Sequence, residues 1–334
     1  MKRAANFPAN IHPTPAWYSE RVSQPPDQQA PDQLAPDQLA QNHRLRIAAI
    51  KFLNPAPLMW DFEHEPHQTE LASRYRLELM LPSACAERLA LPRFGPDAHP
   101  GAADIGLIPV AALATTPGLA ILPGCAIASK RRVRSILLVH RASRPLTEIR
   151  TVAADTSSRS SLAYAQILFK QRWNPAAVFL PHRPDLDPML DTADAALLIG
   201  DPALYALEER RNREERTGEE LIYHDVAEEW IAHTGLPWVA AVWAIREASL
   251  AAGSRTLAEI AADFTTSRDR GLANIDTLVT EWGARMALHK QTIHTYLTSN
   301  IYYFLDEECQ AGLRRFFQLA AETGILPACN LKLD

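Results

Sequence analysis

The segment VAADTSSRSSLAYAQILF, from Val152 to Phe169, decides the fold class of this chain. Its first three residues end an apolar run that is typical of a buried strand, and the part from Ser160 onward has the apolar spacing of a helix. Seven polar residues, from Asp155 to Ser161, separate the two. A strand that ends in a polar loop and then enters a helix is the basic unit of α/β proteins. The segment therefore predicts an α/β fold.

The polar loop of this unit has the features of an anion-binding site. The first N–H groups of a helix have no partner within the helix, and the helix dipole places a partial positive charge beside them. Hydroxyl groups at Ser158, Ser160 and Ser161 can donate to the same anion, and Arg159 supplies a full charge. Capping a helix needs one hydroxyl, whereas this loop holds five. We therefore expect carboxylate or phosphate binding here, with a helix cap or a solvated turn as the alternative.

Further strands and helices are expected on both sides of this unit. The apolar runs predict strands at 45–53, 75–82, 103–109, 133–140, 149–154, 176–181, 194–200 and 238–245. The periodic segments predict helices at 83–91, 110–115 and 160–173 and, from Thr256 to the end, helices only. Strands that alternate with helices favour parallel sheets.

Two stretches of the chain echo one another. ADIGLIPVAAL begins at Ala103 and ADAALLIGDPAL begins at Ala193. Each contains an acidic residue, a buried strand, a break and a helix, and each follows a strand that ends in a polar loop. Two similar α/β lobes that face one another would produce this repeat, and chance is the alternative.

Composition limits the class of protein. The chain has 334 residues, 47% of them apolar, which is enough for two lobes. A net charge of -5 gives no reason to expect nucleic acid or membrane as a partner. No secretory signal and no apolar run of about 20 residues is present, so we expect a cytoplasmic protein. Residues 1–43 are rich in Pro, Gln and Asp and are expected to be a disordered tail.

Ligands of open α/β sheets bind where the carboxyl ends of the strands run into loops. Besides the loop before Ser160, this rule selects the loops that contain Asn54, Ser83, and the pair Gly200 and Asp201. Each has a structural alternative. Asparagine is a common turn residue, and Ser83 and Asp201 are both suitable N-caps for the helices that follow them.

Familiar cofactor and nucleophile motifs are missing from the sequence. It contains no G-x-S-x-G, no P-loop, no G-x-G-x-x-G and no C-x-x-C pair. We therefore expect chemistry that uses no nucleotide, no metal, no other cofactor and no covalent serine.

The motifs together resemble the chorismate dehydratase family, which opens the futalosine route to menaquinone. The resemblance covers about residues 44–327 and includes IKFLNPAPL, ADIGLIPVAAL, IRTVAADTSSRSS, DAALLIGDPAL and EEWIAHTGLPWVAAVWA. It implies a type 2 periplasmic-binding-protein-like fold with a ligand cleft between two lobes and a helical C-terminal segment. Lobe one would contain residues 44–139 and 241–334 and lobe two residues 140–240. The strands at 133–140 and 238–245 would be the crossings between lobes.

The resemblance also implies a hydro-lyase reaction on chorismate, a small molecule with two carboxylates. Loss of water gives the aromatic product 3-[(1-carboxyvinyl)oxy]benzoate. Asn54 would bind either the leaving hydroxyl or a substrate carboxylate that acts as the base. Ser83 and the helix start at Ser158–Ser161, including Arg159, would bind carboxylates. Gly200 would let the backbone approach the ligand, and Asp201 would be an acid or a polar anchor.

Two other functions fit the same fold. One is a cytoplasmic carboxylate-binding or sensing protein that uses the cleft without chemistry. The other is an enzyme similar to the dihydroxynaphthoate synthase of the same pathway, whose site is centred on a histidine. The four polar loops contain no histidine, which favours the dehydratase.

Overall fold

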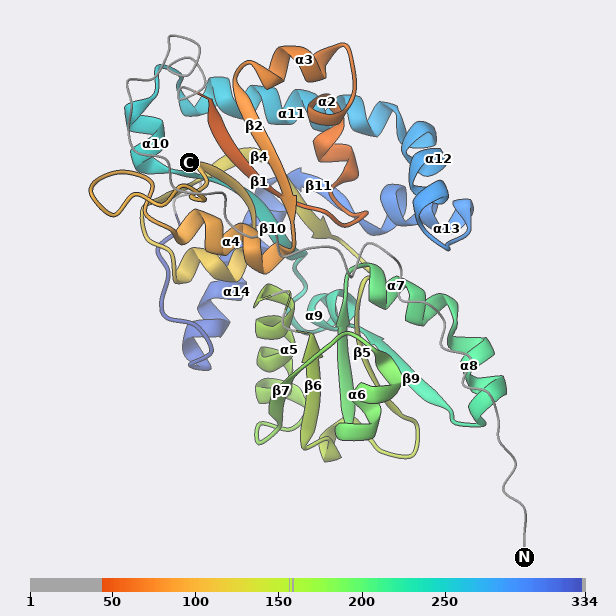
Figure 1. Cartoon of the computed structure of the whole chain (residues 1–334). Coiled ribbons are helices and arrows are strands. Elements are labelled where there is room, and N and C mark those ends of the chain that lie inside the picture. The colour runs from red at the N-terminus through yellow and green to blue at the C-terminus, as the bar shows by residue number, and fades with distance from the viewer. Residues whose placement is uncertain (1–43, 156, 158, 332–334) are drawn as a thin grey trace, which may run out of the picture. The chain divides into compact units, whose positions relative to one another are not determined.

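Two mixed β-sheets, each flanked by helices, organise the part of the chain that the structure describes (Figure 1). This computed structural model describes residues 44–331 except residues 156 and 158. The expected N-terminal tail, residues 1–43, and the candidate residue Ser158 therefore lie outside the described residues. No helix of the described part is both long enough and apolar enough to cross a membrane.

The first sheet has six strands. In spatial order these are β11 (Tyr302–Leu305), β4 (Leu119–Ser129), β10 (Trp238–Arg246), β3 (Ile105–Pro109), β1 (Leu45–Ile50) and β2 (Tyr75–Met80). Strand β1 runs parallel to β2 and β3, whereas β10 runs antiparallel to β3 and β4. The carboxyl ends of β1, β2 and β3 therefore lie at one edge of this sheet.

The second sheet has five strands. Their order is β7 (Val178–His182), β6 (Thr151–Asp155), β8 (Ala195–Ile199), β5 (Ile136–Arg141) and β9 (Leu221–Asp225). Strand β6 is parallel to β7 and β8, and β5 is antiparallel to β8 and β9. The carboxyl ends of β6, β7 and β8 share one edge.

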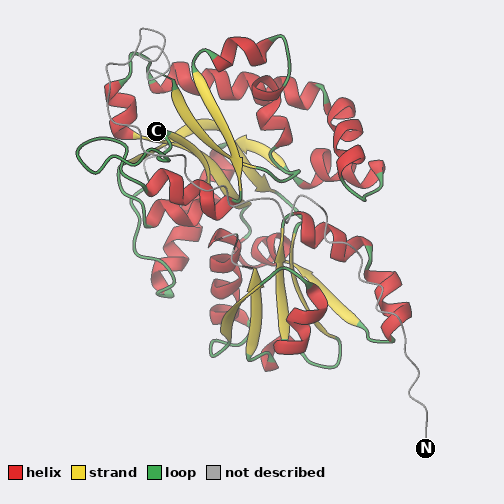
Figure 2. Cartoon of the chain, viewed as in Figure 1, coloured by secondary structure: helices red, strands yellow, loops and turns green. Residues whose placement is uncertain are grey.

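Helices connect these strands and cover the sheets (Figure 2). Before the second sheet come η2 (Ala56–Met59), α2 (Trp60–Glu63), α3 (His67–Ala72), α4 (Pro82–Ala90) and η3 (Val110–Ala114). Around the second sheet come η4 (Leu146–Glu148), α5 (Arg159–Arg172), α6 (Leu186–Thr192), α7 (Asp201–Glu208), α8 (Arg210–Thr217) and α9 (Val226–Thr234). The C-terminal third contains α10 (Glu247–Ala252), α11 (Leu257–Ala273), α12 (Ile275–Arg285), α13 (Lys290–Thr295), the π-helical turn η5 (Tyr296–Asn300) and α14 (Glu307–Glu322).

Several expectations about the strands are wrong in detail. The sheets are mixed rather than parallel, and β11 interrupts the segment after Thr256 that was expected to be helical. Neither expected crossing strand crosses, because β5 lies wholly in the second sheet and β10 wholly in the first. The chain instead passes between the sheets after Ser129 and before Trp238. The lobe boundaries at 139/140 and 240/241 fall inside β5 and β10, and the division into those lobes stays a prediction.

An aromatic cluster packs helices of the second sheet against β10 of the first. Tyr164 of α5 meets Trp230 of α9 edge to face, with ring centroids 4.7 Å apart, and lies 4.3 Å from Phe316 of α14. The Tyr164 hydroxyl donates to the carbonyl oxygen of Val239 at 3.0 Å. All of these rings are buried, and so is Trp238 beside them. Because burying aromatic surface is strongly favourable, this cluster is a main contribution to the packing of α5.

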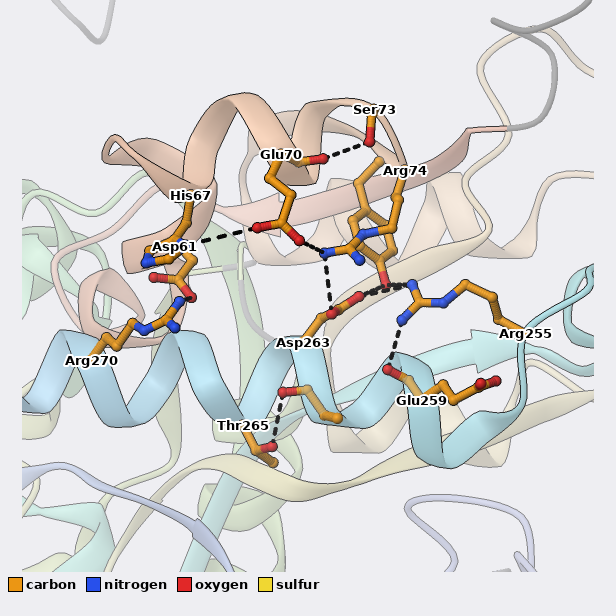
Figure 3. A network of polar contacts seen from close by, with 12 residues as sticks. Asp61, His67, Glu70, Ser73, Arg74, Arg255, Glu259, Asp263, Thr265 and Arg270 are labelled. Carbon is orange, nitrogen blue, oxygen red and sulfur yellow. Dashed lines mark hydrogen bonds and ion pairs between the residues drawn. The ribbon is translucent and has the colours of Figure 1, made fainter.

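A polar network holds α11 against the first sheet and α2 (Figure 3). Asp263 of α11 accepts a hydrogen bond from the Tyr75 hydroxyl at 2.6 Å and pairs with Arg255 at 2.8 Å. Asp61 of α2 is buried and pairs with Arg270 of α11 at 2.7 Å. Removing one partner of such a pair would leave a buried charge without compensation.

We predict that Gly271→Ala destabilises the fold. A Cβ at Gly271 of α11 would collide with the backbone carbonyl of Pro57 in η2, and backbone cannot move aside as a side chain can. The expected loss in the free energy of unfolding is about 1–3 kcal/mol, measured by urea denaturation. Gly283→Ala in α12 is the matched control, since its Cβ would meet the flexible Lys290 side chain at 3.3 Å. Equal stability of the two variants would contradict this packing.

Candidate functional site

The predicted site residues lie in the loops or first helical turns that follow parallel strands, and these segments of the two sheets contact one another. Asn54 lies in the loop after β1, whereas Ser83 and Ala111 lie at the starts of α4 and η3, which follow β2 and β3. Ser160 and Asp201 lie at the starts of α5 and α7, which follow β6 and β8. Three hydrogen bonds, each donated by a backbone N–H of a first-sheet loop, join the two groups of loops.

The first of these bonds engages Asp201. The Leu53 N–H donates to the Asp201 carboxylate at 3.4 Å, which is a long contact. Asp201 is 6% exposed, and burial raises its pKa to about 7, although the hydrogen bond from Leu53 opposes this shift. The expectation that Asp201 caps its helix is wrong. Helix α7 begins at Asp201 itself, and the carboxylate reaches toward the first sheet instead.

Gly200 has a backbone conformation that only glycine adopts readily. Its φ is 63° and its ψ is −143°. A Cβ at this position would lie 2.8 Å from the Phe52 ring. The Gly200 N–H donates to the Ser135 carbonyl at 2.7 Å. Glycine is therefore required for the loop after β8 to approach the loop after β1, while its approach to a ligand stays a prediction.

Asn54 carries a buried polar atom that has no hydrogen-bond partner. The residue as a whole is half-buried, but its Oδ1 is shielded from solvent and accepts no hydrogen bond from any described residue. Buried polar atoms are satisfied in most proteins, so an exception needs an explanation. Asn54 directly follows Leu53, whose N–H contacts Asp201.

Ser83 is not the N-cap of its helix, contrary to the sequence-based expectation. Helix α4 begins at Pro82, and Leu81 occupies the cap position without a side-chain cap. The Ser83 N–H lies in the first turn, where it has no partner within the helix. It donates across the loops to the Ser157 carbonyl oxygen at 3.1 Å. A role of the Ser83 hydroxyl in binding stays a prediction.

The helix start after β6 separates its candidate residues into buried and exposed ones. Ser160 is fully buried, and its Oγ accepts the N–H of Ala111 at 3.2 Å. Ser161 is also buried. Arg159 is exposed and pairs with Glu87 of α4 at 3.7 Å. The Ser160 oxygen thus joins two segments of the chain, and anion binding at this helix start stays a prediction.

Tyr296 and Ser135 are two further residues close to these loops, and no sequence motif marks either of them. Tyr296 is fully buried in the π-helical turn η5, and its hydroxyl is hydrogen-bonded to the Ser135 side chain. Burial raises the pKa of Tyr296, and the negative charge of Asp201 contributes to the shift. Through its hydrogen bond, Tyr296 fixes Ser135, the residue before β5, whose carbonyl oxygen accepts the Gly200 N–H. A π-helical turn often marks a functional site, but a single sequence does not reveal one.

Asp201 and Asn54 supply the two chemical functions of this region, proton donation and hydrogen-bond acceptance. A carboxyl group with a pKa of about 7 is protonated in part of its population at neutral pH and can donate a proton. A buried amide oxygen can accept a hydrogen bond from a hydroxyl group. Among the described residues, no cluster of three or more His, Cys, Asp or Glu side chains is arranged to hold a metal ion.

Solved structures with a similar fold include several binding proteins. A protein from Archaeoglobus fulgidus aligns with a TM-score of 0.59 and 15% identity, covering 85% of this chain and 99% of that one. The periplasmic aliphatic sulphonate binding protein of Escherichia coli gives a TM-score of 0.56 and 13% identity, with 85% and 94% covered. At such identities the likeness concerns the fold, and it confirms the predicted periplasmic-binding-protein-like α/β fold.

The amino-acid sequence is also similar to that of a named enzyme and matches a family model. The chain is 29% identical over 206 residues to the chorismate dehydratase of Thermus thermophilus, covering 59% of this chain and 72% of the relative. The family model described as menaquinone biosynthesis matches residues 45–322. The match includes all the loops described above and confirms the resemblance seen in the motifs. The chain belongs to the menaquinone biosynthesis family.

Proposed function

We propose that this protein is a chorismate dehydratase, a hydro-lyase that converts chorismate to 3-[(1-carboxyvinyl)oxy]benzoate on the futalosine route to menaquinone. The observation that carries the proposal is the unpartnered, buried Oδ1 of Asn54, in the loop whose Leu53 N–H contacts the partly protonated Asp201. The relative from Thermus thermophilus, named chorismate dehydratase, supports the choice of substrate. The substrate would lie among the loops at the carboxyl ends of β1, β2, β6 and β8.

The reaction needs two bonds to break. The C3–H bond loses its proton, its electron pair becomes the third double bond of the ring, and the C4–O bond breaks. The leaving hydroxyl takes up a proton and departs as water. Because the ring becomes aromatic, the enzyme mainly has to orient the substrate and assist proton movement. A carboxylate of the substrate accepts the C3 proton.

Asn54 is assigned to the C4 hydroxyl rather than to that carboxylate. Its unpartnered Oδ1 is an acceptor, so the group it binds must be a donor. A hydroxyl is a donor, whereas an ionised carboxylate is an acceptor only. Satisfying a buried acceptor recovers the cost of leaving it unpaired, about 1–3 kcal/mol.

Asp201 is assigned as the proton donor to the leaving hydroxyl. Burial favours its neutral form, which is the form that can donate, and a pKa of about 7 suits an acid that works near neutral pH. The same burial would make an ionised Asp201 a poor neighbour for a dianionic substrate. A protonated Asp201 avoids this repulsion.

The carboxylates of the substrate are assigned to the starts of α4 and α5. Each helix begins at the carboxyl end of a strand, one in each sheet, and each helix dipole favours an anion beside its first turn. The Ser83 N–H and the Ser157 carbonyl contact each other at 3.1 Å, so the two starts are close. Arg159, paired with Glu87 at the surface, adds positive charge to this region.

The first prediction is that purified protein converts chorismate to the aromatic product and that Asn54→Leu lowers kcat by about 10²-fold or more. Losing one oriented polar contact to the reacting group has an effect of about this size. Product is followed by its ultraviolet absorbance and by chromatography. Asn212→Leu on the exposed face of α8 is the control and should keep full activity. Tight binding of chorismate without product would instead favour a binding protein.

The second prediction concerns stability and pH. The folded-state pKa of Asp201 is raised from an unfolded value of about 3.9 to about 7, so folded protein holds an extra proton between these pH values. Stability therefore falls as pH rises through this window. Asp201→Asn should abolish this fall. The free energy of unfolding of the variant, relative to that of the wild type, should therefore rise by about 2–3 kcal/mol from pH 5 to pH 8. Urea denaturation at both pH values measures the change.

Asp276→Asn, on the exposed face of α12, is the control for that experiment. Its stability should follow that of the wild type at every pH. If the free energy of unfolding depended on pH in the same way for wild type and Asp201→Asn, the Asp201 carboxyl of the folded protein would be ionised across the whole range from pH 5 to pH 8.

The third prediction concerns catalysis and pH. If Asp201 donates the proton, kcat/KM of the wild type falls as pH rises through about 7, because the acid is lost. Asp201→Asn should lower kcat/KM at pH 6 by about 10²–10⁴-fold and remove the fall near pH 7. If Asp201→Asn were slower but its kcat/KM still fell near pH 7, another group would be the proton donor.

A further inference from the structure

A pocket lies toward the other end of α5 from the candidate site. It has a volume of about 280 Å³ and is formed by the second half of α5, the start of β7 and the turn that follows α14. None of the residues assigned to the candidate site lines it. Lys170, which does, is ten residues from Ser160 on the same helix, about 15 Å along the helix axis. The pocket is therefore separate from the proposed substrate site.

Two aromatic side chains form part of the pocket wall. Phe169 of α5 and Phe179 of β7 meet edge to face, with centroids 5.3 Å apart and planes at 89°. Ala177 and Ile325 lie beside them. Phe169 is buried and supports the half-buried Phe179, which can contact a further flat ring.

The polar groups of the pocket are hydrogen-bond donors. Lys170 is exposed, and its ammonium donates to the Thr323 carbonyl at 2.6 Å, which leaves two of its three donors unused. Gln166 is half-buried, and its side chain makes no hydrogen bond with another described residue. Among the described residues, no carboxylate lines this pocket. Its charge therefore complements an anion rather than a cation.

We infer that this pocket is a second ligand site, which binds a small monocyclic aromatic carboxylate. The ring would pack against Phe179, Ala177 and Ile325, and the carboxylate would accept hydrogen bonds from Lys170 and Gln166. A pocket in which aromatic side chains and a few polar groups converge is a usual form of a small-molecule site. The inference goes beyond the proposed function, because it requires neither turnover nor the residues assigned to the dehydration.

The test uses benzoate as the probe and isothermal titration calorimetry of the full-length protein. We expect saturable binding with a Kd of about 1 mM or below, as befits a ligand of this size. Benzamide, which has the same ring without the charge, should bind at least tenfold more weakly. Lys170→Gln keeps a donor for the Thr323 carbonyl but loses the charge, and should weaken benzoate binding at least tenfold. Ala177→Phe fills the pocket and should abolish binding.

Two controls separate this site from the proposed substrate site. Lys290→Gln removes a different exposed lysine and should bind benzoate as the wild type does. Asn54→Leu should also bind benzoate normally, whether or not it turns over chorismate. Urea denaturation checks that Lys170→Gln folds. The inference is overturned if benzoate does not saturate, if Lys170→Gln binds it unchanged, or if Asn54→Leu abolishes its binding.

Discussion

The candidate site depends on the burial of the Asp201 carboxyl, which accepts a hydrogen bond from the Leu53 N–H. Isolating a charge from water is costly, and no cation contributes to the pKa of this group, so burial favours the neutral acid. The same contact brings the loop after β8 to the loop after β1, which carries Asn54. The Leu53–Asp201 contact thus helps to join the two sheets, while burial sets the protonation of the group that we assign to catalysis.

Backbone geometry makes this arrangement possible. The left-handed φ of Gly200 turns the chain sharply at the end of β8, and its lack of a Cβ admits the Phe52 ring. Its N–H is fixed by the Ser135 carbonyl, and the Ser135 side chain is bonded to the buried Tyr296. The position of Asp201 therefore depends on three distant parts of the sequence. Phe52 and Ser135 contact Gly200, and Tyr296 holds Ser135.

Much of the fold could be predicted from the sequence, because buried strands and polar loops have strong local patterns. Strand β4 escaped prediction because Pro123 and Gly124 interrupt it, and its pairing with β10 is irregular there. The loops of the site were also identifiable, since strand ends alone locate them. Their side-chain roles were not. Ser83 and Asp201 have the local signature of caps, but contacts with the opposite loops decide what they bind.

The buried acid also distinguishes chemistry from binding on this fold. A protein that only holds an anion benefits from fixed donors and positive charge, and a buried carboxyl beside the ligand adds nothing to that task. An elimination of water needs a proton for the leaving hydroxyl, which a neutral carboxyl supplies. The first-turn N–H groups of α4 and α5 would suit either role, whereas a buried neutral Asp201 together with an unpartnered amide oxygen at Asn54 suits the reaction. The case for an enzyme therefore rests on these two side chains and not on the fold.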